Sequence, residues 1–134
     1  MKRDYILYAQ KIKDIGERIC EISNNRTPIS TERMSIEELR NSHLELQNLI
    51  NSYKKCKLDL LEINPPNMMQ QEHEGLTNAI QMFITGAESM YKGIDLGTFS
   101  VDEIMIIEGT VIEKQAEILT VNSVDSIVYK LIND

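Results

Sequence analysis

Apolar residues recur at alternating spacings of three and four along most of the chain, the pattern of helices that bury one face. The pattern covers residues 3–23, 36–63, 67–95 and 101–132. The first three seams are Tyr5, Tyr8, Ile12, Ile15, Ile19 and Ile22; Leu39, Ser42, Leu46, Leu49, Tyr53, Cys56, Leu60 and Ile63; and Met69, His73, Leu76, Ile80, Phe83, Ala87, Met90 and Ile94. The fourth is Ile104, Ile107, Val111, Lys114, Ile118, Val121, Asp125, Val128 and Ile132. We therefore predict an all-α chain of four helices.

Helix-breaking and capping residues separate these four segments. The stretch 24–28 ends in Pro28 and 64–67 contains two prolines, which disfavour helical geometry in the residue before them. Ser35 with Glu38, and Ser100 with Glu103, have the spacing of reciprocal capping pairs at helix starts.

The fourth segment also has features of a strand. All five valines of the chain follow residue 100, which lowers helix propensity, and Asn122-Ser123 is a place for a kink. The helical spacing nevertheless continues through this region, so we expect a helix. Because the later connections are short, neighbouring helices should run antiparallel. The prediction is one domain, residues 1–134, folded as an up-down-up-down four-helix bundle.

Charge is divided unevenly between the two halves of the chain. The net charge is −7, with about +1 in residues 1–67 and −8 in residues 68–134. An acidic balance argues against nucleic-acid binding, which requires a basic face. The acidic half is interpreted as a solvated surface or, alternatively, as a docking face for a basic protein partner.

Targeting and membrane signals are absent from the sequence. Asp4, Gln10 and Lys11 interrupt the apolar stretch that a secretory signal would need, and no apolar run approaches the roughly 20 residues of a membrane span. Cys20 and Cys56 are too few for a disulfide framework. We expect a cytoplasmic protein that does not bind membranes.

Metal and cofactor motifs are missing as well. The Glu-x-x-His pattern of di-iron bundles would need Glu where Arg40 and Gln70 precede His43 and His73. There is no Cys-x-x-Cys pair, no glycine-rich phosphate loop and no Gly-x-Ser-x-Gly elbow. No metal and no cofactor are expected.

Counting helical rise from one end of the bundle places four polar side chains, Tyr8, Cys56, His73 and Asp125, at a similar height. The chemical interpretation is a Cys56 thiolate activated by His73, with Asp125 orienting the imidazole. The alternative is a hydrogen-bonded layer that fixes helix register while Cys56 only packs. We favour the second alternative and expect no enzymatic activity.

Helix–helix contact surfaces are suggested by small and flexible residues. Gly86 and Gly93 lie one heptad apart and would allow a second copy to approach closely in a homodimer; close packing inside the bundle is the alternative. Met68, Met69, Met82, Met90 and Met105 suggest core filling or an adaptable apolar groove.

Residues 64–94 carry a loose pattern of Asn-Pro-Pro followed by His73, Leu76, Phe83, Gly86-Ala87 and Gly93-Ile94. This pattern resembles small uncharacterised proteins of Gram-positive bacteria, mostly domains of unknown function. The resemblance implies a helical bundle and carries over no catalytic residue.

Three functions follow as hypotheses. The first is a non-enzymatic bundle that works through protein contacts, as a homodimer. The second is an inhibitor or immunity-type protein whose acidic face neutralises a basic partner. The third is a small-ligand sensor with a cavity in the methionine-rich middle.

Overall fold

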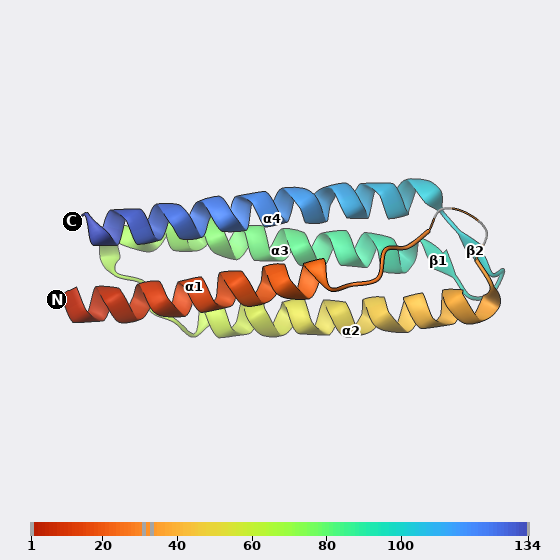
Figure 1. Ribbon diagram of the computed structural model, residues 1–134, viewed down its shortest axis with the longest axis horizontal. Coiled ribbons are helices and arrows are strands. Elements are labelled where there is room, and N and C mark those ends of the chain that lie inside the picture. The colour runs from red at the N-terminus through yellow and green to blue at the C-terminus, as the bar shows by residue number, and fades with distance from the viewer. Residues whose placement is uncertain (1, 31, 33, 134) are drawn as a thin grey trace.

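The structure, a computed structural model, describes residues 2–30, 32 and 34–133 and consists of four long helices lying side by side (Figure 1). They are α1 (Lys2–Asn24), α2 (Ile36–Leu61), α3 (Gln70–Lys92) and α4 (Glu103–Ile132). A 3-10 turn, η1 (Asn67–Met69), precedes α3, and a hairpin of β1 (Ile94–Asp95) and β2 (Ser100–Val101) joins α3 to α4. The predicted all-α four-helix bundle is confirmed.

The four helices form a ring in which each successive pair is in contact. α1 packs on α2 and α4, and α3 packs on the same two helices. The two chain ends lie at one end of the bundle together with the α2–α3 connection, and the hairpin lies at the other end (Figure 1). The helices therefore run up, down, up and down, as predicted.

The helix starts agree with the predicted caps at one of two positions. Ser35 and Glu38 form the reciprocal capping box of α2. At α4 the cap is Asp102, whose carboxylate accepts from the backbone N–H groups of Ile104 and Met105. Ser100 belongs to β2, so the predicted Ser100 cap is wrong by two residues. α4 continues without a break through residues 122–123, and the alternative of a terminal strand is excluded.

The core contributed by α1, α2 and α3 follows the predicted seams. The buried members of these seams are Tyr8, Ile12, Ile15 and Ile19; Leu39, Leu46, Leu49, Tyr53, Cys56 and Leu60; and Met69, His73, Leu76, Ile80, Phe83, Ala87, Met90 and Ile94. Tyr5, Ile22 and Ile63 pack against this core at its edge. A regular apolar stripe on one side of each helix was therefore sufficient to identify its buried face.

α4 turns a different face inward from the predicted one. Its buried residues are Ile106, Gly109, Glu113, Ala116, Thr120, Val124, Ile127 and Leu131. The predicted seam of branched apolar residues points outward, with Ile104 68% and Ile118 60% exposed. The prediction for this helix is wrong because α4 carries apolar residues on both sides, and spacing alone favours the more regular side.

Two glycines explain why this face of α4, rather than the face with the predicted seam, packs against α3. A Cβ added at Gly109 would lie 2.5 Å from the carbonyl oxygen of Gly86, and one added at Gly86 would lie 2.8 Å from that of Gly109. Such separations are far below contact distance, so α3 and α4 touch through backbone atoms at this point. Gly93 is likewise close to Met105 and Ile106. Both glycines therefore serve close packing inside the bundle, which is the alternative given above, and the hypothesis of a dimer contact on Gly86 and Gly93 loses its basis.

We expect Gly109→Ala to lower the free energy of unfolding by about 1–3 kcal/mol, because the new methyl group overpacks a backbone contact that cannot yield without moving a helix. Gly75→Ala on α3 is the matched control. A Cβ there meets nothing within 4 Å, so we expect it to stabilise by about 0.5–1 kcal/mol. Urea denaturation of the three proteins gives both values. A neutral Gly109→Ala variant would contradict the close contact.

Candidate functional site

The outward face of α4 is the most apolar exposed surface that the described residues offer along one helix. We call it the outer seam; its members are Ile104, Ile107, Val111, Lys114, Ile118, Val121, Asp125, Val128 and Ile132. Ile107 is 55% exposed and Ile132 is 74% exposed, and only Val128 is half-buried. Single exposed apolar residues are normal in soluble proteins, whereas a contiguous exposed row marks an interaction site.

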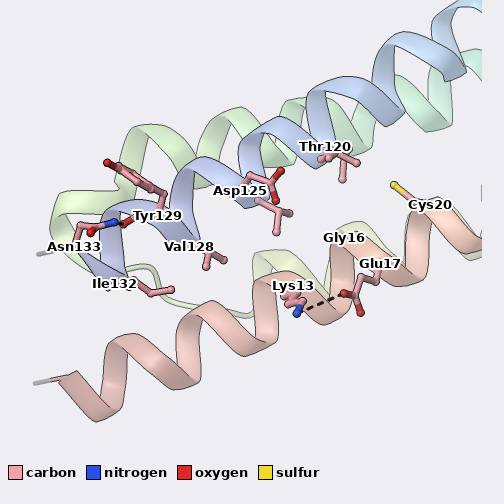
Figure 2. A pocket seen from close by; sticks show the side chains of 12 residues that line it. Lys13, Gly16, Glu17, Cys20, Thr120, Asp125, Val128, Tyr129, Ile132 and Asn133 are labelled. Atoms are coloured by element: carbon pink, nitrogen blue, oxygen red, sulfur yellow. Dashed lines mark hydrogen bonds and ion pairs between the residues drawn. The ribbon is translucent and has the colours of Figure 1, made fainter.

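A groove runs between α1 and α4 beside the outer seam. One part, of about 640 Å³, lies between Gly16 and Cys20 of α1 and Val124 and Val128 of α4 (Figure 2). A second part, of about 380 Å³, continues towards the chain ends and shares Lys13, Val128 and Ile132 with the first. α1 therefore leaves one side of α4 incompletely covered. Neither part is lined by methionine, so the groove differs from the cavity expected in the methionine-rich middle.

Most of the exposed surface that lines the groove is apolar. Lys13 and Glu17 form an exposed ion pair of 3.9 Å on its α1 side. Burial, with a smaller contribution from Glu117, raises the pKa of the Cys20 thiol to about 11, so this thiol is protonated at neutral pH. Thr120 lies in the wall, and its hydroxyl is the single buried side-chain polar atom without a hydrogen-bond partner among the described residues.

Tyr8 and His73 form the centre of the predicted polar layer. The Tyr8 hydroxyl lies 2.7 Å from Nδ1 of His73, and both side chains are buried. Burial lowers the pKa of the imidazole, so the ring is neutral and Nδ1 can accept a hydrogen bond from the Tyr8 hydroxyl. Burial also raises the pKa of the Tyr8 phenol above its ordinary value, helped by the charge of Glu72. The pair is a stable neutral hydrogen bond between α1 and α3.

The other two predicted members do not join this pair. Asp125 is exposed and lines the groove, because α4 is rotated relative to the predicted seam. Cys56 lies on the buried face of α2, and no hydrogen bond links its thiol to His73 in the described structure. The structure therefore does not assemble Cys56, His73 and Asp125 as a nucleophilic triad. The alternative of a register-fixing hydrogen bond agrees with the geometry for Tyr8 and His73, and Cys56 packs in the core as that alternative states. Asp125 takes no part in it.

A buried carboxylate that sequence reasoning missed lies at the middle of the bundle. Glu113 of α4 accepts from the Tyr53 hydroxyl at 2.6 Å and from Nε of Arg26 at 2.7 Å. Its side chain is 4% exposed, and that of Arg26 is 12% exposed. Glu113 thus joins α4 to α2 and to the chain that follows α1.

The electrostatics of this cluster follow from its burial. Burial and the adjacent Glu113 charge raise the pKa of the Tyr53 phenol above its ordinary value, so Tyr53 remains a hydrogen-bond donor. The Arg26 guanidinium neutralises the carboxylate, as a buried charge requires. The sequence contained a signal for the inner position of Glu113. Gly109, Glu113, Ala116 and Thr120 form a stripe of small and polar residues with the same spacing of three and four as the outer seam.

Metal binding and membrane insertion find no support in the described part of the chain. Its residues contain no group of three His, Cys, Asp or Glu side chains arranged to hold a metal ion. None of its helices combines the length and apolarity needed to cross a bilayer.

Comparisons with known proteins return no relative. The chain matches no protein-family model, no curated protein and no solved structure. The resemblance to small Gram-positive bundle proteins therefore stays a prediction.

Removing one partner of the buried ion pair should be costly. We expect Arg26→Ala to lower the free energy of unfolding by about 3–5 kcal/mol, because Glu113 remains buried without its counter-charge. The double variant Arg26→Met/Glu113→Leu should cost much less, because neither charge is then buried alone. Chemical denaturation measures both, and equal losses would show that the ion pair does not act as a coupled unit.

The stability of the protein should depend on His73 below neutral pH. The pKa of His73 is lower in the folded protein than the ordinary 6.5, so the unfolded chain binds the proton first. The contribution of neutral His73 to the free energy of unfolding is therefore fully present above pH 6.5. It is lost as the pH falls towards the pKa of His73 in the folded protein. We expect His73→Gln to flatten this part of the stability–pH curve and His43→Gln to leave it intact. Identical curves for both variants would contradict the assignment.

Proposed function

We propose that the protein is a non-enzymatic helical bundle that works through protein–protein contacts, and that the outer seam of α4 is its contact surface. The observation that carries the proposal is the row of exposed isoleucine and valine side chains along α4. A helix that is apolar on all sides is normally covered on all sides. Within the chain, α1 and α3 cover only the inner half of α4.

The apolar character of the outer seam favours a protein as the covering partner. Helix faces with apolar residues every three and four positions dock against other helices or into apolar grooves. α2 also exposes Ile36, Leu44, Leu58 and Leu61. The positions at helical spacing between Leu44 and Leu58 are polar, so these residues do not form one row. The outer seam is thus the surface to test first.

The test is site-specific photo-cross-linking in the cells that make the protein. A photoreactive residue replaces Ile118 in one variant and Leu44 in the control, which is similarly exposed at 57%. We expect discrete cross-linked species from position 118 and none of comparable yield from position 44. Equal, diffuse cross-linking from both positions, or none from 118, would overturn the proposal.

A second candidate function, a sensor for a small apolar ligand, is favoured by the groove between α1 and α4, whose exposed lining is mostly apolar. A ligand with an apolar body would fill this groove. Native mass spectrometry with medium-chain fatty acids and alcohols tests the sensor. Specific binding of one of these compounds would favour it, and the absence of any bound mass would remove it.

The acidic inhibitor, the cytoplasmic location and membership of a Gram-positive bundle family remain predictions. The geometry described above adds no argument for any of them.

A further inference from the structure

The outer seam keeps an unbroken alternation of three and four over its whole length, from Ile104 to Ile132. This is the spacing of the a and d positions in a coiled coil. The surfaces of α1, α2 and α3 that face solvent carry no comparable row among the described residues. A second helix with the same spacing would fit this face best.

Two charged residues interrupt the apolar row at related positions. Lys114 and Asp125 each lie one seam position outside the central pair of Ile118 and Val121. Both side chains are exposed, and neither forms an ion pair with another described residue of the chain. From Ile107 to Ile132 the seam is therefore symmetric about the point between Ile118 and Val121. Apolar positions mirror apolar positions, and the basic Lys114 mirrors the acidic Asp125.

We propose that this face binds a second copy of the chain, with the two α4 helices antiparallel and a two-fold axis passing between Ile118 and Val121. The inference rests on the proposed function and names its partner. In this register Ile118 faces Val121 of the second copy, and Lys114 faces Asp125 of the second copy. Because the two-fold axis relates the two copies, the ion pair between Lys114 and Asp125 forms twice.

Further pairs in the same register are apolar. Val111 faces Val128 of the second copy and Ile107 faces Ile132 of the second copy, so each a position meets a d position as antiparallel coiled coils require. On the solvent side, Gln115 lies near Asn122 of the second copy, and Glu108 lies near Tyr129 of the second copy. No like charges meet among these pairs.

Other arrangements are worse by the same criteria. A parallel pair would place Lys114 against Lys114 and Asp125 against Asp125 of the second copy, and like charges in contact are destabilising. An antiparallel pair shifted by one heptad would place both charges opposite apolar side chains, which leaves them unpaired. The two charges thus select one orientation and one register, as single polar residues do in coiled coils.

The position of the groove agrees with this arrangement. Val121, Asp125, Val128 and Ile132 belong to the outer seam and also line the groove between α1 and α4. A second α4 lying on the seam therefore covers one rim of the groove. This additional contact with α1 enlarges an interface that a single pair of helices would leave small.

The experiment is a charge exchange followed by sedimentation of separate and mixed variants. Lys114→Asp makes both seam charges acidic, and Asp125→Lys makes both basic. We expect the wild type to dimerise reversibly and each variant alone to dimerise at least about tenfold more weakly. An equimolar mixture of the two variants should recover the wild-type affinity as a heterodimer. The double variant Lys114→Asp/Asp125→Lys should also recover it.

Circular dichroism and the thermal midpoint establish that each variant folds, since both residues are exposed. Glu74→Lys, an exposed charge reversal on α3, is the matched control and should dimerise like wild type. A monomeric wild type, or variants that dimerise without regard to mixing, would overturn the inference. If the wild type is monomeric while position 118 still cross-links to a different protein, the proposed function survives and only the second copy is wrong.

Discussion

The backbone contact between Gly86 and Gly109 determines how the fourth helix is rotated in the bundle. Because neither residue has a side chain, α3 and α4 approach until each glycine lies against the carbonyl of the other. Any rotation of α4 that brought its outer seam inward would place isoleucine and valine side chains in this space. Near this contact the inner face of α4 therefore carries Gly109, Glu113, Ala116 and Thr120, and larger apolar residues follow towards the end of the helix. The exposed seam and the groove beside α1 are consequences of that choice.

The same contact explains the buried carboxylate. Glu113 follows Gly109 by one helical turn, and a Cβ at Gly86 would lie 3.2 Å from its Cγ, so the glutamate lies in the same closely packed region. A carboxylate there is tolerated only if it is paired and hydrogen-bonded. Arg26 and Tyr53 provide both, which ties the chain after α1 to the bundle. Through these two contacts the buried Glu113 favours one arrangement of α1, α2 and α4.

The parts of the fold predicted correctly are those where one helix face is clearly more apolar than the other. Seams through Ile12, Tyr53 and Phe83 identified the core because the opposite faces of those helices are mostly polar. α4 has no such contrast, and the choice between its two faces depends on the glycine of a neighbouring helix. Spacing along a single helix contains no information about that neighbour. Asp125 was misplaced for this reason, whereas Tyr8 and His73, on unambiguous helices, were placed correctly.

The two faces of α4 are specialised for different kinds of contact. The inner face uses small residues to bring backbones together and a buried ion pair to fix the arrangement within the chain. The outer face uses bulky β-branched residues with an exact spacing of three and four, which suits side-chain interdigitation between separate helices. An exposed apolar row would invite indiscriminate association if nothing opposed it. In the proposed dimer, the net charge of −7 and the two opposite charges within the row limit that association and favour one orientation of the partner helix.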